Sequence, residues 1–384
     1  MTSILEAARG IEKTMIEDRR YLHANAETAF DLPITTAYVK KRLLEMNIEP
    51  MEICKSGLTA TIGQGGKTIL IRADMDALPI KENTDVSYKS LNENSHVCGH
   101  DMHTAMLLGA AGILKNQEHE LEGTIKLMFQ PSEEYGQGAK AMVAAGLLEN
   151  PKVDAAIALH VSAEMNPGKV RYCKGIATSA MDTFLVEIHG KGGHSSAPQL
   201  AIDPLLIVNN IYMTLNGLIG KEVDPAETAV LTIGRCGGGT ASNIIPDKAV
   251  IDMGLRSQNK EVRKHLTERI LRIINDVTLM LRGTYTIERI STPAIYNDPI
   301  LCEQMNKYIA EIVGAGNIEI GAKPLMVTED FSYISENIPT MFIWAGAGNE
   351  TNFPLHNPNV KFEENMMPFG AAILANCAIN WLKD

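Results

Sequence analysis

Four side chains that could bind a metal ion lie within six residues: Cys98, His100, Asp101 and His103. A thiolate, imidazoles and a carboxylate form the donor set that Zn²⁺ and related divalent ions prefer in proteins. A strand that ends near Asp74 and Asp76 precedes this cluster, and a helix is expected to follow it. The density of donors therefore predicts a metal site at a strand-to-helix junction.

A pair of adjacent carboxylates, Glu133 and Glu134, follows a predicted buried strand at 124–129. In open α/β sheets, ligands bind at the carboxyl ends of the strands. Two neighbouring carboxylates there allow one to bind metal while the other stays free as a general base. This division of roles is typical of metal-assisted hydrolysis.

Two further histidines occupy comparable positions. His160 directly follows an apolar run that ends at Leu159, and His356 lies in a Gly-, Asn- and Pro-rich loop after a late strand. The alternative for His160 is a histidine packed in the core. Together with the other clusters, these residues end different strands at corresponding places, and a two-metal site needs about that many protein donors.

The elements that must position these residues alternate between strands and helices. Apolar spacing predicts helices at 4–22, 35–46, 104–114 and 138–147, and short apolar runs predict strands at 68–72, 124–129 and 153–159. Such alternation predicts an α/β fold with a mostly parallel sheet covered on both faces.

The pattern changes between residues 181 and 291. Strand, helix, strand, strand, helix and strand are expected at 183–188, 203–218, 228–233, 248–253, 262–277 and 284–289, which is the βαββαβ order of a ferredoxin-like unit. Patterns of the first kind resume at 300–313, 340–344 and 364–382. We therefore expect a discontinuous catalytic metal-binding domain at 1–180 and 292–384, with an inserted lid or dimerisation domain at 181–291.

Composition narrows the class of protein. The 384 residues contain 35 Lys+Arg and 46 Asp+Glu, a net charge of −11, which argues against nucleic-acid or anionic-membrane partners. The N-terminal residues do not resemble a signal peptide, and no apolar run is long enough to span a membrane. The six scattered cysteines are typical of a reducing cytoplasm. We expect five of them to pack as small apolar residues and Cys98 to be the exception.

Eight motifs follow one another along the chain: Arg72–Pro79, Cys98–His103, Gln130–Glu134, Leu159–Val161, Gly193–Pro198, Ser242–Asp247, Thr328–Phe331 and His356–Pro358. In these motifs the chain resembles the M20 family of metallopeptidases and amidohydrolases, in the branch of N-acyl-amino-acid, hippurate and auxin-conjugate hydrolases. The resemblance covers nearly the whole sequence.

The resemblance implies a catalytic domain that binds two divalent ions, which could be Zn²⁺, Mn²⁺, Co²⁺ or Ni²⁺. It implies a set of five ligands: Cys98, His100, Glu134, His160 and His356. Glu133 would be the general base. The residues expected to orient these ligands are Asp74, Asp76, Asp101 and His103.

The same resemblance places three residues of the inserted domain near the substrate. His194 and Asn243 would approach it, with His194 coming from either its own subunit or a partner subunit. Arg256 could pair with a substrate carboxylate. The implied enzyme is a cytoplasmic metal-dependent amidohydrolase that cleaves N-acetyl or N-aroyl amino acids, which are small anionic amides. It would form a homodimer, or a dimer-based oligomer, through the inserted domain.

Two other functions stay open from the sequence. A dinuclear-metal dipeptidase or aminopeptidase would need an acidic group for the substrate ammonium, whereas Arg256 favours a carboxylate. A non-catalytic metal- or ligand-binding homologue would have no need of the base Glu133. The sequence departs from the family pattern at Ala26 (where Pro is usual), in Gly234–Gly239 and in Val161–Asn166, which bears on the identity of the substrate.

Overall fold

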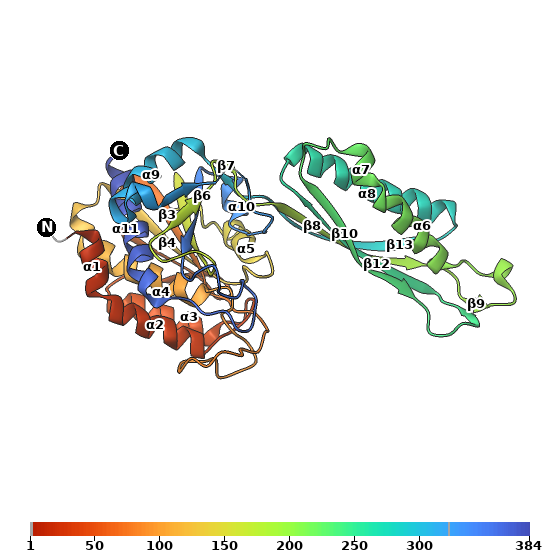
Figure 1. Ribbon diagram of the computed structural model, residues 1–384, viewed down its shortest axis with the longest axis horizontal. Helices are drawn as coiled ribbons and strands as arrows, with labels where there is room; N and C mark the ends of the chain where they lie inside the picture. Colours follow the sequence, from red (N-terminus) through yellow and green to blue (C-terminus); the bar gives the residue numbers. More distant parts are fainter. Residues whose placement is uncertain (1–2, 322) are drawn as a thin grey trace. The chain divides into compact units, whose positions relative to one another are not determined.

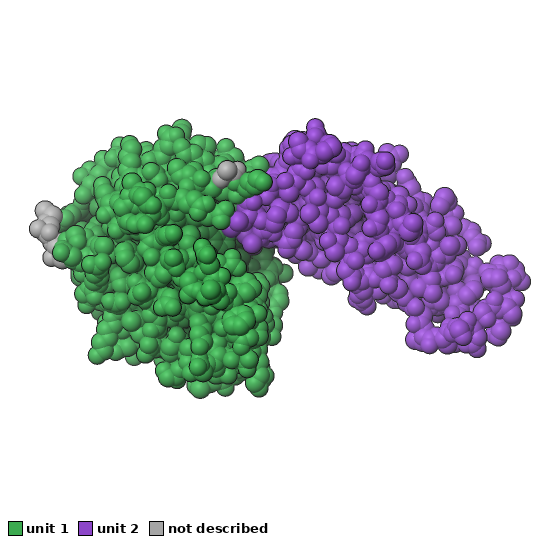
Figure 2. Space-filling model, viewed as in Figure 1, with its two compact units in different colours: residues 1–177, 295–323, 329–384 green, residues 178–294, 324–328 purple. Residues whose placement is uncertain are grey.

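A computed structural model describes residues 3–321 and 323–384, so that Met1, Thr2 and Ala322 lie outside the described residues. The chain divides into two compact units (Figure 2). Unit 1 comprises Met1–Ala177, Ile295–Lys323 and Glu329–Asp384, and unit 2 comprises Thr178–Ala294 and Pro324–Thr328. The segment Pro324–Thr328 is a part of unit 2 that the sequence pattern does not indicate.

Unit 1 is built on an eight-stranded sheet with the order β1-β2-β4-β3-β5-β16-β6-β15 (Figure 1). Its strands are β1 (Met51–Cys54), β2 (Gly57–Gly63), β3 (Lys67–Asp74), β4 (Gly123–Gln130), β5 (Ala155–Ser162), β6 (Val170–Tyr172), β15 (Ile318–Ile320) and β16 (Thr340–Gly346). The four central strands β4, β3, β5 and β16 run parallel. The α/β fold class is thereby confirmed.

Both faces of this sheet are buried, as expected for parallel strands. Alternate side chains of β3 show this directly, because Ile69 and Ile71 pack into one apolar cluster and Leu70 into another. The first cluster includes residues of α1 (Ile4–Gly10), α2 (Glu12–Ala24), α3 (Pro33–Glu45), α4 (His100–Asn116), α9 (Pro299–Val313) and α11 (Met367–Lys383). The second includes residues of α5 (Gly138–Ala144) and α10 (Ser332–Ser335).

Helix α4 begins four residues before the predicted start at 104. His100, Asp101 and His103 interrupt the apolar period there, although they are buried in the first turn. Gly99, the N-cap, has φ 85°, and a Cβ at this position would come within 2.4 Å of Val161 Cγ2. Glycine therefore lets the chain turn tightly from Cys98 into the helix.

Unit 2 has a four-stranded antiparallel sheet with the order β10-β12-β8-β13. Its main elements are β8 (Ala180–His189), α6 (Pro204–Asn216), β10 (Ala229–Gly238), β12 (Lys248–Ser257), α8 (Lys260–Met280) and β13 (Thr284–Thr292). Apolar residues of α6 and α8 pack on one face of the sheet in a separate core. Asp203 and Asn259 cap these helices through their side chains. The order is the predicted βαββαβ.

The shorter elements complete the two units. In unit 2, β9 (Gly193–His194) pairs with β11 (Ile244–Ile245), and α7 (Leu218–Glu222) follows α6. In unit 1, β7 (Gly175–Ile176) pairs with β14 (Tyr296–Asn297). Within the described residues, no helix has the length and apolar character needed to cross a membrane.

The prediction for the five ordinary cysteines is partly wrong. Cys173, Cys302 and Cys377 are buried, but Cys54 is half-buried and Cys236 is exposed. Cys236 lies on β10, an edge strand of its sheet. The residue type alone did not reveal the exposure of Cys236, because an apolar side chain does not show whether another element covers it.

Candidate metal centre

The carboxyl ends of the central strands bring together the donors predicted in unit 1. Donor atoms of Cys98, His100 and Glu134 all lie within 4.8 Å of one another, and so do those of a second group formed by Asp74, His100, His103 and His160. His100 belongs to both groups. The Cys98 Sγ and His160 Nε2 atoms are 3.5 Å apart, and His356 Nε2 lies 3.4 Å from Glu134 Oε2. All five predicted ligands therefore lie in one continuous cluster.

Backbone carbonyls orient two of the imidazoles. The Nδ1 atom of His100 lies 2.7 Å from the carbonyl of Asp76, and Nδ1 of His160 lies 2.7 Å from the carbonyl of Val161. A carbonyl only accepts, so each Nδ1 must carry a proton, and Nε2 is the nitrogen that faces the cluster and is left to bind a metal ion. This is the arrangement of metal-ligating histidines.

The cluster contains buried polar atoms that lack partners among the described residues. His100 Nε2 and Glu134 Oε1 are fully buried and accept or donate no hydrogen bond. Unpaired polar atoms of this kind are costly, since burial removes their water without replacing it. Both atoms face the other donors, so a divalent cation would satisfy them. The residues present thus fit a metal site.

The electrostatics of the centre favour cations. Burial disfavours the charge of His100, but Asp74, Asp76 and Glu134 outweigh this effect and raise its pKa to about 10. Burial raises the pKa of Glu134 to about 7. Burial and the neighbouring glutamates raise the pKa of the Cys98 thiol well above its usual value. Negative charge that attracts protons so strongly also attracts a metal ion, which would bind in their place.

Asp76 holds the turn that carries the two adjacent glutamates. Its carboxylate accepts hydrogen bonds from the backbone N–H of Glu133 at 2.9 Å and from that of Glu134 at 3.2 Å. The turn also needs Gly138, because a Cβ there would lie 1.6 Å from the Pro131 carbonyl oxygen. One carboxylate at the end of β3 therefore fixes both acidic residues that follow β4.

Glu133 differs from Glu134 in its surroundings. Its side chain is buried, with a residue exposure of 8%, and its carboxylate lies near those of Asp74 and Glu329. Burial, followed by Glu329 and Glu134, raises the pKa of Glu133 well above its usual value. No hydrogen bond to its carboxylate is present among the described residues, so its oxygens are available to a water molecule.

Asp74 and His103 form a supporting pair behind the cluster. Asp74 Oδ1 lies 2.6 Å from His103 Nδ1, and the other nitrogen of His103 accepts a hydrogen bond from the backbone N–H of Val161 at 2.9 Å. Both nitrogens of His103 are thus engaged. The second oxygen, Asp74 Oδ2, lies 3.3 Å from His100 Nε2, facing the donors.

Asp101 points to a different network. Its Oδ2 accepts from Arg19 Nε at 3.0 Å and lies 2.9 Å from His23 Nδ1. The other nitrogen of His23 contacts Glu82 at 3.1 Å. Burial disfavours the charge of His23, but Asp101 and Glu82 outweigh it and raise its pKa to about 9. Glu27, four residues after His23, caps α3 by accepting from the backbone N–H of Thr35 at 2.9 Å.

The sequence did not identify Arg72 and Glu329 as members of the site. Arg72 is 1% exposed, donates to both oxygens of Glu329 at 3.1 and 2.8 Å, and lies 3.0 Å from Asp74. Both residues occur in motifs that the family resemblance rests on. Membership of those motifs was the one sign in the sequence that both residues belong to the site. Nothing in the sequence indicates that they pair, because 257 residues separate them.

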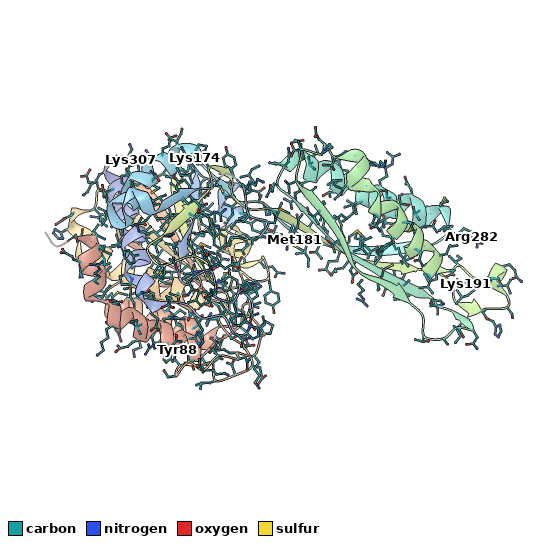
Figure 3. The ribbon with its side chains drawn as sticks, viewed as in Figure 1. Tyr88, Lys174, Met181, Lys191, Arg282 and Lys307 are labelled. Atoms are coloured by element: carbon teal, nitrogen blue, oxygen red, sulfur yellow. The ribbon has the colours of Figure 1, made fainter. Side chains whose placement is uncertain are left out.

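Of the three predicted substrate residues of unit 2, His194 and Asn243 lie in neighbouring segments and Arg256 lies apart from them. His194 is exposed on β9, and the Ser195 backbone N–H donates to the Asn243 carbonyl at 3.2 Å. Arg256 is at the opposite end of the β8–β12 pair, beside Met181. Figure 3 shows Met181 and Lys191 at opposite ends of this unit. Arg256 lies eight residues beyond Lys248 on β12, which corresponds to about 26 Å of strand.

Arg256 is half-buried and makes no ion pair within the described ranges. Its Nη1 donates to Thr328 Oγ1 at 2.7 Å and to the Met326 carbonyl at 3.3 Å. Burial lowers the pKa of its guanidinium. A half-buried cation without a carboxylate partner is suited to bind an anionic group.

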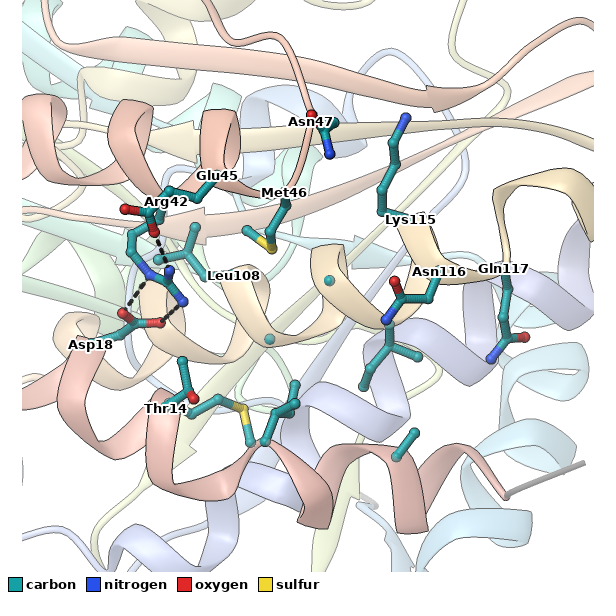
Figure 4. A pocket seen from close by; sticks show the side chains of 16 residues that line it. Thr14, Asp18, Arg42, Glu45, Met46, Asn47, Leu108, Lys115, Asn116 and Gln117 are labelled. Atoms are coloured by element: carbon teal, nitrogen blue, oxygen red, sulfur yellow. Dashed lines mark hydrogen bonds and ion pairs between the residues drawn. The ribbon is translucent and has the colours of Figure 1, made fainter.

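A separate pocket of about 430 Å³ lies in unit 1, away from the donors (Figure 4). Its lining includes Leu108 and Lys115 of the second half of α4, whereas the metal donors occupy the first turn of that helix. The charges at its rim are paired within the protein, because Arg42 contacts Asp18 and Glu45. This pocket is not part of the metal centre.

A buried set of Cys, His and Glu donors beside a free carboxylate, at the carboxyl edge of a parallel sheet, defines a metal-dependent hydrolase. The family model described as peptidase family M20/M25/M40 matches residues 70–380. The chain belongs to this family, and it is a hydrolase of amide bonds.

Three similar proteins illustrate the range of the family. IAA-amino acid hydrolase ILR1-like 5 of Arabidopsis thaliana is 35% identical, over 96% of this chain and 87% of its own length. The hippurate hydrolase of Campylobacter jejuni is 35% identical, over 95% of this chain and 96% of its own. A dinuclear metal-binding M20 peptidase from Bacillus subtilis has a similar structure, with a TM-score of 0.82, 29% identity and coverage of 98% and 99%.

Proposed function

We propose that this protein is a two-metal amidohydrolase that cleaves N-acyl amino acids into a carboxylic acid and a free amino acid. The observation that carries the proposal is the free, buried carboxylate of Glu133 next to a donor cluster with unpaired atoms. The names of the plant and Campylobacter relatives, which describe hydrolysis of acylated amino acids, support this substrate class.

Cys98, His100, Glu134, His160 and His356 would hold the ions. Divalent ions bound there would polarise the substrate carbonyl and make a water molecule more acidic. Glu133 would take a proton from the water that attacks the acyl carbon, and would then give it to the leaving amine as the amide bond breaks. Asp76 keeps Glu133 in place for both transfers through its bond to the backbone N–H.

Arg256 supports the choice of an anionic substrate. A product-side amino acid retains a free carboxylate, and a guanidinium binds carboxylates through two parallel hydrogen bonds. An aminopeptidase would instead need an acidic group for the substrate ammonium. Arg256 therefore supports an anionic substrate, and the names of the plant and Campylobacter relatives favour acylated amino acids among such substrates.

We further propose that the enzyme acts as a homodimer with unit 2 as its lid and dimerisation domain. Arg256 lies at one end of the β8–β12 pair, whereas His194 lies on β9, which follows the other end of β8, so a single copy of unit 2 is too long to place both on one small substrate. A second copy would supply the missing residue. Strand β10, an edge of the unit 2 sheet, offers unpaired backbone groups for such an interface. A cytoplasmic location suits the free Cys98 thiol.

The proposal is tested with a panel of N-acetyl, N-benzoyl and longer N-acyl amino acids alongside free dipeptides. Each substrate is assayed on protein reconstituted with Zn²⁺, Mn²⁺, Co²⁺ or Ni²⁺. We expect hydrolysis of blocked amino acids with at least one metal and none by metal-free protein. Activity on free dipeptides alone would support a peptidase instead.

A further inference from the structure

Arg19 is a fully buried cation that joins three segments of unit 1. It is 1% exposed, and its Nε donates to Asp101 Oδ2 at 3.0 Å. Its Nη1 donates to the carbonyl of Phe362 at 3.3 Å and lies 3.2 Å from Glu364 Oε1. One side chain of α2 thus links the first turn of α4 to the segment that follows His356.

Each end of this link adjoins proposed metal ligands. Asp101 directly follows His100 in the first turn of α4. On the other side, the ring of Phe362 packs near Gly99, because a Cβ built there would lie 3.3 Å from the Phe362 Cζ atom. Gly99 separates Cys98 from His100. The contacts of Arg19 therefore help to fix the position of Cys98 and His100 relative to the segment that carries His356.

His356 depends on its segment for its position. Its side chain is 52% exposed, so packing restricts the ring only partly. Its backbone has φ 66°, a left-handed conformation that a residue other than glycine adopts at a cost and that surrounding contacts must maintain. Two backbone bonds hold the segment nearby, from His356 N to the Val97 carbonyl at 3.0 Å and from Asn83 N to the Pro358 carbonyl at 2.8 Å.

We propose that Arg19 is a positioning residue of the metal centre, which holds the segment 356–364 against the first turn of α4 and so sets the separation of His356 from His100. The planar guanidinium suits this role, because it donates in fixed directions to acceptors on different segments. The proposal rests on His356 being a ligand, as in the proposed function. Partners that orient metal ligands typically change metal affinity by about 10- to 100-fold.

The first test compares Arg19→Met with the neighbouring Arg20→Met. Arg20 also binds Glu364, at 3.0 and 2.7 Å, but Asp101 and Phe362 are held by Arg19. Metal-free full-length protein is titrated with Mn²⁺ by calorimetry. We expect Arg19→Met to weaken binding of one ion by about 10- to 100-fold and Arg20→Met to leave it within about twofold. Equal effects of the two substitutions, or none from Arg19→Met, would overturn the proposal.

A second test asks whether Arg19 acts through His356. If it does, Arg19→Met combined with His356→Ala should bind Mn²⁺ no more weakly than His356→Ala alone, because the two residues form one unit. Independent, additive losses would overturn the role of Arg19 while leaving His356 a ligand. Unchanged binding by His356→Ala would overturn both the ligand assignment and this proposal.

The folding of Arg19→Met is checked by thermal unfolding of the metal-free protein. If this variant does not fold, Glu364→Gln replaces it in the same cycle, because Glu364 is a partly exposed partner of the same guanidinium. We expect Glu364→Gln to give a smaller loss of Mn²⁺ affinity in the same direction, absent again in the His356→Ala background. If folded Glu364→Gln binds Mn²⁺ with unchanged affinity, the proposal that Arg19 positions His356 is overturned.

Discussion

Arg72 and Glu329 form a buried two-point ion pair, with nitrogen–oxygen distances of 3.1 and 2.8 Å. Arg72 lies at the end of β3 and Glu329 follows Thr328, 257 residues later in the sequence. The pair brings positive charge next to Asp74 and a carboxylate next to Glu133. The pair thus joins two distant segments of unit 1 and also contributes to the charges around the metal centre.

Glu329→Gln should destabilise unit 1, because a neutral amide replaces a carboxylate that accepts two charge-assisted hydrogen bonds in a buried place. We expect the free energy of unfolding to fall by about 1–3 kcal/mol, measured by urea denaturation. The matched control is Glu319→Gln, since Glu319 is exposed and 3.7 Å from Arg171. If Glu329→Gln loses no more unfolding free energy than this control, the Arg72–Glu329 pair does not stabilise unit 1.

Glu133→Gln should keep metal binding and lose most turnover. The amide has nearly the shape of the carboxylate but cannot accept the proton of the attacking water, and general base catalysis contributes about 10²- to 10⁴-fold. Metal content by atomic absorption and kcat on an N-acyl amino acid are measured on the same preparation. Glu164→Gln, an exposed residue after β5, is the control. Near-normal turnover in Glu133→Gln would end its assignment as base.

Asp76→Ala should impair turnover and metal binding together. Its loss leaves the backbone N–H groups of Glu133 and Glu134 without acceptors in a buried turn, at a cost of about 1–3 kcal/mol each. Asp76→Asn retains an oxygen for one of them, so we expect a milder effect. Metal titration and kcat distinguish these variants. Equal activity of Asp76→Ala and the unaltered protein would show that other contacts fix the turn.

Mixing two inactive variants should restore activity if His194 acts across the dimer. In a heterodimer of His194→Ala and Glu133→Gln chains, one site combines an intact Glu133 with an intact His194 from the other subunit. With random pairing, half of the dimers are mixed and one site in each is complete, so roughly a quarter of normal activity should return. No recovery in verified heterodimers would place His194 at the site of its own subunit.

Asp182 should make unit 2 sensitive to acid. Burial alone would raise the pKa of Asp182, but Arg263, Ser291 and Arg289 outweigh it and lower the pKa. The stabilisation is therefore present above the unfolded-state pKa of about 3.9 and is lost as the pH falls through the lower folded-state value. We expect Asp182→Asn to reduce the unfolding free energy near neutral pH and to flatten its decline in acid.

The measurement for Asp182 is urea denaturation at several pH values between neutral and strongly acidic. Asp252→Asn is a useful control, because Asp252 lies on β12 of the same sheet but contacts Arg235, which is largely exposed. Identical pH profiles for Asp182→Asn and the unaltered protein would show that the arginines gain no stability from this carboxylate.

The sequence predicted the order of the main elements because their apolar periods are strong and local. It predicted β3, β4 and β5, whose side chains are buried along almost their full length. It did not predict the β1–β2 hairpin, in which the edge strand β1 has four residues and an exposed first half. Edge strands have a weaker pattern, since less of their surface is covered.

The predicted ligands meet because strand ends share one edge of a sheet, a relation that follows from topology alone. The surrounding network is different. Arg19, His23 and Glu82 come from α2 and a loop, and only the tertiary fold brings them to Asp101. Their roles depend on contacts over long sequence separations, for which a single sequence carries no periodic signal.

The first turn of α4 has a further consequence for the centre that it carries. Peptide dipoles add up along a helix and place about half a positive elementary charge at its N-terminus, here at His100. That field repels cations and attracts anions. The surrounding carboxylates must therefore outweigh the helix to retain metal, while the helix itself favours the negative charge that develops on oxygen when an amide is attacked.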